Sequence, residues 1–350
     1  MIADIRLKQY RSYLDKTIAL NNGSNVIYGP NASGKTNLLE AIMMICVGKS
    51  YRAGDFELVM SGKSWSRIDA SLSDGQKRTL KINLDDRTPK TFTINNKNTK
   101  RLTFNHQIPV VLFEPNHLSL VFGSPDNRRS YMDYILEQTN PSYKKTRNDY
   151  LKSLRQRNSL LKSGNVKKSE IFPWDISLSQ LGGSLVLARN ELSEIINSQI
   201  ATVYKSLSSG KDKITTRYVP HVDISSYETK LLRKLEQDLE LDIIRGYTAH
   251  GPHREDMEIL INNQKPSSVA SRGETRTITI ALKIIEADII KQKLGKNPIL
   301  LMDDIFSELD SKRANHLSEF IRQGQSIITT TDLSIIKNRA KGNLIDITKT

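Results

Sequence analysis

A glycine-rich stretch near the start of this 350-residue chain constrains its fold more than any other feature. Residues 29–36 read Gly-Pro-Asn-Ala-Ser-Gly-Lys-Thr, which fits the phosphate-binding pattern Gly-x-x-x-x-Gly-Lys-Thr. An apolar run at 26–28 precedes the pattern, and a helix-like run at 38–47 follows it. A strand before the loop and a helix after it are the context that the pattern requires. A chance glycine-rich turn is the alternative.

The residue types of the loop suit a nucleotide phosphate and its magnesium ion. Gly29 and Gly34 permit backbone angles and a close approach that larger residues forbid, so N–H groups at a helix start can face a phosphate. Lys35 would bring positive charge to the phosphates and take part in catalysis, and the Thr36 hydroxyl would bind Mg²⁺. ATP and Mg²⁺ are therefore the predicted cofactors. The predicted nucleotide-binding residues of the loop are Gly29, Pro30, Asn31, Ala32, Ser33, Gly34, Lys35, Thr36 and Asn37.

A second feature is an apolar run at 298–302 that ends in Asp303 and Asp304. A phosphate-loop ATPase needs a buried strand of this kind opposite its loop. We expect Asp303 to support the metal and Asp304 to act as the catalytic base that polarises the attacking water. An apolar run ending in acids is common by itself, and the pairing with the loop makes it specific.

A third feature opens the helix predicted from Arg272 to Leu294. Ser271 and Glu274 have the spacing of a capping box, in which each side chain satisfies a free N–H group of the helix start. A helix start with a small serine and with Gly273 also presents free donors to an anion such as a γ-phosphate. The two interpretations are compatible, and both stay open at this point.

The order of predicted elements gives three segments. Strand-like alternation marks the first 124 residues, with an antiparallel meander at 68–94 and a fully apolar central strand at 109–113. From residue 125 the pattern is mostly helical, and strands return after residue 245. We therefore predict a lobe with the phosphate loop at 1–124, an inserted helical arm at 125–245, and a lobe with the Ser-x-Gly segment and the acidic strand at 246–350.

The chain has a net charge of +14, from 52 Lys and Arg against 38 Asp and Glu. So basic a protein often has a polyanion as partner, because neutralised phosphates release counterions. A single cysteine, Cys46, excludes an intramolecular disulfide and indicates a reducing cytosol. No apolar run approaches the about 20 residues of a membrane span, and we see no signal peptide. We therefore expect a cytoplasmic protein without a membrane partner.

The densest basic region spans residues 144–168, with nine Lys or Arg and one acid, Asp149. Leu151, Leu154 and Leu161 give the same segment an apolar stripe at helical spacing, so we expect the bases on the outer face of a packed helix. A nucleic-acid contact and a merely solvated face are the two interpretations. The predicted DNA-binding residues are Lys144, Lys145, Arg147, Lys152, Arg155 and Arg157.

Taken in order, the loop, the Ser-x-Gly segment, the acidic strand and the Ser-Glu-Leu-Asp that follows it look like an ABC-type ATPase head. In detail the chain resembles the RecF family of bacterial recombination and gap-repair proteins, essentially from end to end. The segments that carry this resemblance are Tyr10–Tyr13, 29–37, Gly123–Pro125 with Arg128, Arg129 and Asp133, Arg157–Lys162, Trp174–Asp175, Gly251–Asp256, Ser271 with Gly273, and Leu301–Asp310.

The resemblance implies an α/β fold: an ABC-type P-loop ATPase head of two lobes with an inserted helical arm domain. Such heads form a dimer when ATP binds, and each nucleotide lies between the loop of one subunit and the signature of the other. By position, Ser271, Gly273 and Glu274 would contact the partner's nucleotide. Thr330 or Thr331 falls near the switch residue of the family.

The function implied is ATP-dependent DNA binding in recombinational gap repair and replication-fork maintenance, at the nucleoid. Double-stranded or gapped DNA, a homodimer partner and RecR- and RecO-like proteins are the implied partners, and a weak, DNA-stimulated ATPase would act as a switch. The alternative is an SMC-like ATPase subunit of a DNA-processing or defence complex. That alternative would need a nuclease centre or sustained heptads, and we find neither. The long gap between Thr36 and Ser271 disfavours the motor subunit of a transporter.

Three positions depart from the family pattern. Glu274 stands where the family usually has glutamine, which adds negative charge beside the γ-phosphate and should weaken dimer closure unless Arg272 or Arg276 offsets it. Residues 115–117 read Pro-Asn-His where the family tends to have two acids after a proline. Asp304 is one methylene shorter than the glutamate common in ABC heads, which is consistent with slow hydrolysis.

Overall fold

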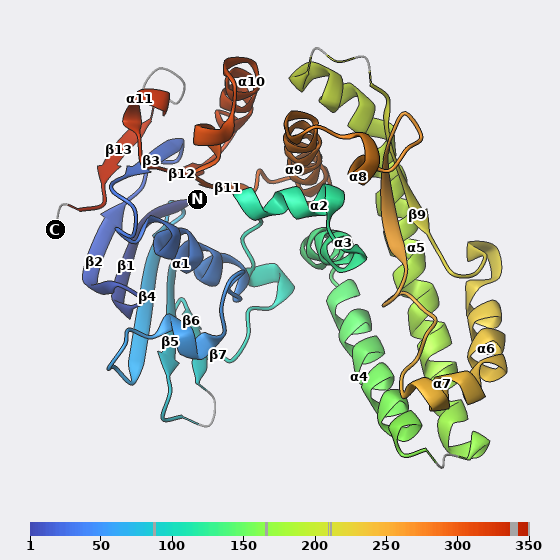
Figure 1. Ribbon diagram of the computed structural model, residues 1–350. Coiled ribbons are helices and arrows are strands. Elements are labelled where there is room, and N and C mark those ends of the chain that lie inside the picture. The colour runs from blue at the N-terminus through green and yellow to red at the C-terminus, as the bar shows by residue number, and fades with distance from the viewer. Residues whose placement is uncertain (87–88, 165–166, 209, 211, 337–341, 349–350) are drawn as a thin grey trace. The chain divides into compact units, whose positions relative to one another are not determined.

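A computed structural model of the chain has two compact units (Figure 1). The first unit comprises residues 1–117 and 286–350, and the second comprises residues 118–285. The residues that the structure describes are 1–86, 89–164, 167–208, 210, 212–336 and 342–348.

A five-stranded parallel sheet forms the centre of the first unit. Its strands, in spatial order, are β13 (Asn343–Asp346), β3 (Ser24–Tyr28), β12 (Ser326–Thr330), β11 (Ile299–Asp303) and β8 (Val110–Phe113). These strands are short and largely apolar because a parallel sheet is covered on both faces. The strand predicted at 109–113 is buried as expected, but β8 lies at the edge of the sheet and not at its centre.

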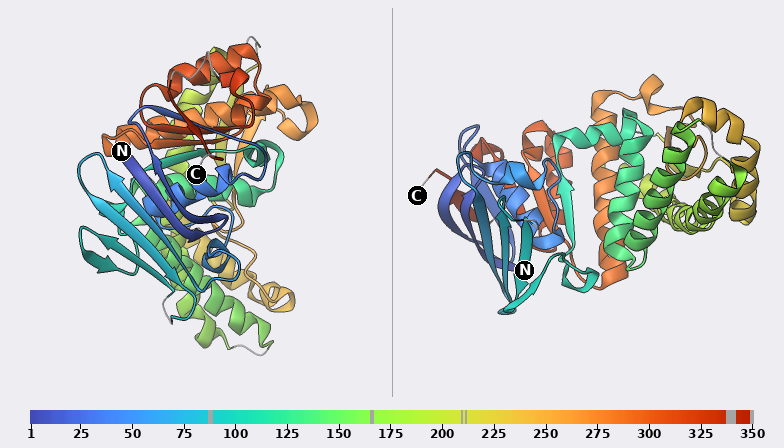
Figure 2. Two further views of the ribbon diagram at one scale, coloured as in Figure 1. Left: turned by 90° about the vertical axis from the view of Figure 1, so that its left-hand side faces the viewer. Right: turned by 90° about the horizontal axis from the view of Figure 1, so that it is seen from below.

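A six-stranded antiparallel sheet forms the rest of this unit's framework (Figure 2). Its strands, in spatial order, are β2 (Tyr13–Ala19), β1 (Ile2–Tyr10), β4 (Trp65–Leu72), β5 (Lys77–Asn83), β6 (Lys90–Ile94) and β7 (Lys97–Thr99). Buried residues alternate with more exposed ones along β4 and β5, as the period of two predicts, so the expected meander is confirmed.

Helix α1 (Lys35–Val47) contacts strands of both sheets and is buried along nearly all its length. A helix that is apolar all round is expected in such a position. Cys46 is among its buried residues. The remaining elements of this unit are η1 (Asp55–Leu58), η2 (Phe104–His106), η3 (Pro115–Leu118, ending at the border of the unit), η5 (Ile305–Glu308), α10 (Ser311–Ile321) and α11 (Leu333–Ile336).

The second unit is mostly helical, with α4 and α5 packed along each other. Its helices are α2 (Ser119–Phe122), α3 (Pro125–Thr139), α4 (Tyr143–Lys162), α5 (Lys168–Leu207), η4 (Ile224–Ser226), α6 (Tyr227–Gln237), α7 (Leu239–Arg245), α8 (Pro266–Val269) and most of α9 (Arg272–Leu294). Strands β9 (Ile214–Val219) and β10 (Asp256–Ile261) form an antiparallel pair beside α5 and α3.

The compact units differ from the boundaries predicted at residues 124 and 245. Residues 246–285 belong to the helical unit, whereas the returning strand pattern assigned them to an ATPase lobe. The reason is a long-range pairing: β10 pairs with β9 along its whole length, from Asp256 opposite Val219 to Ile261 opposite Ile214. A strand pattern shows that a segment is extended, but not which sheet it joins.

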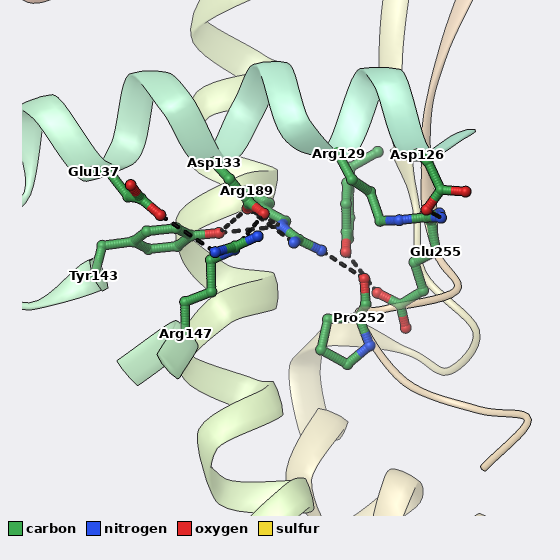
Figure 3. Close-up of polar contacts among 10 residues, drawn as sticks. Asp126, Arg129, Asp133, Glu137, Tyr143, Arg147, Arg189, Pro252 and Glu255 are labelled. Carbon is green, nitrogen blue, oxygen red and sulfur yellow. Dashed lines mark hydrogen bonds and ion pairs between the residues drawn. The ribbon is translucent and has the colours of Figure 1, made fainter. Parts of the chain in front are cut away.

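A buried polar network joins α3, α4 and α5 within the second unit (Figure 3). Arg189 donates to Asp133 Oδ1 at 2.8 Å and to the carbonyl oxygen of Pro252 at 2.6 Å. Tyr143 donates its hydroxyl to Asp133 at 2.5 Å, and Arg147 donates to the same carboxylate at 2.7 Å. Burial by itself would raise the pKa of Asp133, but the charges of Arg189 and Arg147 hold it below its usual value.

His253 lies in the same unit between two hydrogen-bond partners. Its Nδ1 is 2.7 Å from the hydroxyl of the buried Tyr150, and its Nε2 is 3.0 Å from the carbonyl oxygen of Thr248. With tyrosine as donor and the carbonyl as acceptor, these partners suit the neutral ring with its proton on Nε2. Burial lowers the pKa of His253 to about 4, a shift that the nearby Arg254 and Arg129 increase.

We expect this histidine to make the protein less stable in mild acid. The unfolded chain binds a proton near pH 6.5 and the folded chain only near pH 4, so stability is full above pH 6.5 and falls as the pH drops between these values. The expected loss of stability by pH 5 is on the order of 2 kcal/mol. Urea unfolding at pH 7.5, 6 and 5 measures it, with His253→Asn as control. Equal pH slopes for the wild type and the variant would contradict the assignment.

Candidate functional site

The predicted phosphate loop connects the end of β3 to the start of α1, at the carboxyl edge of the parallel sheet. Gly34 lies in the left-handed region, with φ of +96°, where a side chain is strained. A Cβ atom at this position would lie 2.9 Å from both Ser12 Oγ and the Tyr13 hydroxyl oxygen. Both the backbone angle and the close contact therefore require glycine here.

Lys35 spans the loop from the first turn of α1. Its Nζ donates to the carbonyl oxygens of Gly29 at 2.8 Å and Pro30 at 2.7 Å. Burial lowers the pKa of Lys35, and the carboxylates of Asp304 and Asp303 oppose this effect. The ammonium group is thus held against the loop backbone, with two of its three donors on carbonyl oxygens, where phosphate oxygens would be strong competing acceptors.

Thr36 and Asp303 come together although they lie far apart in the sequence. The Thr36 hydroxyl donates to Asp303 Oδ1 at 3.1 Å. A hydroxyl and a carboxylate are the hard oxygen ligands that Mg²⁺ uses, together with water and nucleotide phosphates. Among the described residues, no group of three or more His, Cys, Asp or Glu side chains is placed to hold a metal ion. The Thr36 hydroxyl and the Asp303 carboxylate are oxygen ligands of the kind that Mg²⁺ takes, and their role as its ligands remains a prediction.

Sequence reasoning missed Thr329, the residue that organises the acidic end of β11. Its hydroxyl donates to Asp303 Oδ1 at 2.8 Å and accepts from the backbone N–H of Asp304 at 3.0 Å. The residues expected near the switch position are Thr330 and Thr331. The Thr330 hydroxyl donates to the Asp332 carbonyl oxygen at 3.0 Å, and Thr331 is exposed. Successive residues of a strand point to opposite faces of the sheet. A run of three threonines in the sequence does not show which of them faces the acidic end of β11.

Asp304 has a strained backbone, with φ of +49° in the left-handed region. A non-glycine residue in this region costs about 1 kcal/mol or more, and such strain gathers at functional sites. Two hydrogen bonds hold it there: its N–H donates to Thr329, and its carbonyl oxygen accepts from the Ser307 hydroxyl at 2.6 Å. The predicted catalytic base therefore sits on a backbone that its neighbours fix.

The capping box at the start of α9 is formed. The Ser271 N–H donates to Glu274 Oε2 at 2.7 Å, and the Glu274 N–H donates to Ser271 Oγ at 3.2 Å. The Glu274 carboxylate is thus held on its own helix N-terminus, where the helix dipole favours its charge. Ser271, Gly273 and Glu274 belong to the second unit, and their contact with a nucleotide remains a prediction.

The prediction of a DNA contact is wrong for Arg157, which is fully buried. Its guanidinium donates to Asp175 at 2.6 Å, to Asp242 at 2.7 Å and to the Thr248 hydroxyl at 2.9 Å. A count of charges does not show which face of a helix they occupy. The spacing did carry the signal, since Arg157 lies three and four residues from Leu154 and Leu161 on the buried stripe.

Arg147 is also engaged within the unit, with Asp133 at 2.7 Å and Glu137 at 3.3 Å (Figure 3). Its charge is already compensated, so it is a poor candidate for neutralising a phosphate. The four other predicted residues are exposed on α4, and in the part of the chain that the structure describes no ion pair engages them. We call this set the basic face of α4: Lys144, Lys145, Lys152 and Arg155.

A phosphate loop at the end of one parallel strand, an acidic end on another, and a helical unit inserted between them define an ABC-type P-loop ATPase head. The family model for the RecF/RecN/SMC N terminal domain matches residues 1–349. The chain is 33% identical over 354 residues to the DNA replication and repair protein RecF of Lachnospira eligens, covering 99% of this chain and 96% of that protein. It is 35% identical to the RecF of Shouchella clausii, covering 95% and 93%. The chain therefore belongs to the RecF family.

Solved structures agree with this assignment. The recombination mediator protein RecF-ATPrS of the RecFOR pathway matches with a TM-score of 0.89 and 27% identity, over 99% of this chain and 97% of that chain. RecF-ATP of the same pathway matches with a TM-score of 0.86 and 28% identity, over 95% and 92%. An Smc head bound to a winged-helix domain of ScpA, at 15% identity and a TM-score of 0.54, shares the fold alone. The predicted family and fold class are confirmed.

None of the helices in the described ranges is long and apolar enough to cross a membrane.

Proposed function

We propose that this chain is an ATP-dependent DNA-binding protein of recombinational gap repair and replication-fork maintenance. The observation that carries the proposal is the Thr36–Asp303 contact beside the phosphate loop, in a chain of the RecF family. Solved relatives are RecF structures with ATP or ATPrS in the RecFOR pathway. ATP and Mg²⁺ are the proposed cofactors, and RecR- and RecO-like proteins are the proposed partners.

Each residue of the site has a proposed role. The loop backbone from Gly29 to Thr36 binds the phosphates, and Lys35 adds a positive charge to them. Thr36 and Asp303 hold Mg²⁺, which when bound supplies charge neutralisation at the phosphates. Asp304 orients and deprotonates the attacking water. With an aspartate in place of the longer glutamate common in ABC heads, the proposed activity is a slow ATPase that acts as a DNA-stimulated switch.

We further propose that ATP closes two copies of the chain into a dimer, with Ser271 and Gly273 contacting the partner's nucleotide. The capping box supports this role, because it directs Glu274 to its own helix and so reduces its repulsion of a γ-phosphate. The proposed location is the nucleoid, as DNA binding implies.

The experiment that tests this function is light scattering with and without ATP, Mg²⁺ and a gapped duplex. We expect a monomer without nucleotide, a dimer with ATP and Mg²⁺, and a larger dimer fraction with DNA. A monomer under every condition would remove the ATP-driven clamp from consideration.

The basic face of α4 is the proposed DNA contact. Reversing three of its charges, with Lys145→Glu, Lys152→Glu and Arg155→Glu together, should weaken DNA binding at least about tenfold and lower the salt slope of the binding constant by about 2 to 3. The reason is that each lost phosphate contact no longer releases a counterion. ATP-dependent dimerisation should stay unchanged. Fluorescence anisotropy with a labelled duplex between about 50 and 200 mM salt measures the effect.

The matched control reverses the same number of charges on exposed bases outside α4 in this unit: Lys205→Glu, Lys213→Glu and Arg233→Glu. Similar losses in both triple variants would show that only the overall charge matters and would remove α4 as a specific contact.

A further inference from the structure

The turn between β1 and β2 contacts the start of α1, next to the phosphate loop. Tyr13 donates its hydroxyl to the carbonyl oxygen of Gly34 at 2.9 Å, and the Asn37 amide donates to Ser12 Oγ at 3.0 Å. This turn belongs to the Tyr10–Tyr13 segment, to which the nucleotide chemistry described above gives no role. Its proximity to the loop gives that segment a candidate function.

The bond from Tyr13 completes the hydrogen bonding of one loop carbonyl. The Gly34 oxygen also accepts from the Leu38 N–H at 3.0 Å, in the first turn of α1, so both of its lone pairs are used. The carbonyl of Gly34 and the N–H of Lys35 belong to one planar peptide group and point in opposite directions. Holding the carbonyl therefore also fixes the direction of the Lys35 N–H, which is one of the loop N–H groups proposed to donate a hydrogen bond to phosphate.

Tyr13 is suited to hold this peptide rigidly. Its side chain is 6% exposed, and burial raises the pKa of its hydroxyl far above the usual value, so the group remains a donor. A buried ring whose hydroxyl is bonded to the loop backbone has no face available for stacking on a nucleotide base. Any effect of Tyr13 on a nucleotide therefore passes through the loop.

The turn itself is anchored by Arg11, which lies in the left-handed region with φ of +51°. The Arg11 N–H donates to the Leu58 carbonyl oxygen at 2.9 Å. Its guanidinium makes a two-pronged ion pair with Glu40 of α1, at 2.9 and 3.1 Å, and Ser50 also donates to this carboxylate. Since the Glu40 side chain is only 1% exposed, the pair ties the turn firmly to the helix that follows the loop.

We propose that Tyr13 is a positioning residue for nucleotide phosphate, acting through the Gly34–Lys35 peptide and anchored by the Arg11–Glu40 ion pair. The inference rests on the proposed function, because it assumes that the loop binds a nucleotide. A residue of this kind preorganises the donors of the loop before the ligand arrives, so its loss lowers affinity without changing the reacting groups.

The test is Tyr13→Phe, which removes the hydroxyl and keeps the ring. Titration with a fluorescent ATP analogue in Mg²⁺ should show a Kd raised roughly five- to tenfold. ATP turnover at saturating nucleotide should stay within about twofold of the wild type, since Asp304 and Asp303 are untouched. The matched control is Tyr131→Phe, because Tyr131 also donates a buried hydroxyl to a helix carbonyl, that of Leu282 at 2.7 Å in the second unit.

The unfolding midpoints of the wild type and both tyrosine variants, measured without nucleotide, separate a loss of stability from a loss of nucleotide affinity. We expect similar small shifts in the two variants, with a changed nucleotide Kd in Tyr13→Phe alone. Arg11→Gln should raise the Kd in the same direction, which keeps the inference testable if one variant folds poorly. An unchanged nucleotide Kd in Tyr13→Phe, or an equal loss of nucleotide affinity in Tyr13→Phe and Tyr131→Phe, would overturn this inference but not the proposed function. A wild-type protein that binds no nucleotide would overturn the proposed function as well.

Discussion

Replacing Lys35 with alanine is expected to abolish nucleotide binding, with a loss of at least about 100-fold in affinity. The substitution removes two or more charge-assisted hydrogen bonds to phosphate, each contributing about 1.5–3 kcal/mol. ATP-dependent dimerisation and tight DNA binding should be lost with it, because both depend on bound nucleotide in the proposed mechanism. Titration with a fluorescent ATP analogue, followed by light scattering with a gapped duplex, measures both effects.

The same substitution should leave the fold intact. Burial lowers the pKa of Lys35, so its charge is costly to keep in the folded state, and its removal relieves that cost. The two hydrogen bonds to the loop carbonyls are lost as well, which offsets this gain, so the unfolding midpoint of Lys35→Ala should stay close to that of the wild type. Lys90→Ala is a suitable control, because Lys90 also donates to a main-chain carbonyl of this unit, that of Gly48 at 3.1 Å. A Lys35→Ala protein that still dimerises with ATP would contradict the assignment of the loop.

The parts of the site that the sequence predicts well are those with fixed local spacing. The residues from Gly29 to Thr36 adopt the strand-loop-helix context that their pattern requires, and Ser271 and Glu274 form the capping box that their spacing predicts. In both cases the interacting groups lie within a few residues of one another. Local geometry then determines the contact whatever the rest of the chain does.

Local sequence patterns do not predict contacts that depend on the order of strands in the sheet. The strand β12 lies between β3 and β11, so it is Thr329 that reaches both acids, and no spacing in the sequence indicates that order. The same limit applies to β10, because its extended pattern does not show that it pairs with β9, a strand more than 30 residues earlier in the chain. Resemblance to the RecF family supplied the fold class, which the local patterns alone left open.

Replacing Arg157 with alanine is expected to destabilise the second unit by about 3–5 kcal/mol. Arg157 lies between two buried carboxylates, Asp175 and Asp242, which are 2% and 0% exposed. Removing the arginine would leave both acids without their main counter-charge in a buried setting, which costs far more than an exposed ion pair contributes. Urea unfolding followed by circular dichroism measures the loss.

The neighbouring Arg155 provides the matched control, because it is exposed on the same helix. Arg155→Ala should change stability by no more than about 0.5 kcal/mol while weakening DNA binding. Arg157→Ala should instead lower stability strongly without directly removing a DNA contact. If Arg157→Ala were as stable as Arg155→Ala, the buried ion network would not be a stabilising centre of the helical unit.

The pH dependence of the stability lost in Arg157→Ala tests whether uncompensated charge causes that loss. Burial already raises the pKa of Asp175 above its usual value, and Arg157 opposes that rise. Without the arginine this pKa should rise further, so the folded variant takes up a proton at a higher pH than the unfolded chain does. The stability difference between wild type and variant should therefore shrink as the pH falls from 7.5 to 5, because protonation removes the uncompensated charge. A difference independent of pH would mean that lost packing, and not the uncompensated charge of the buried acids, accounts for the destabilisation.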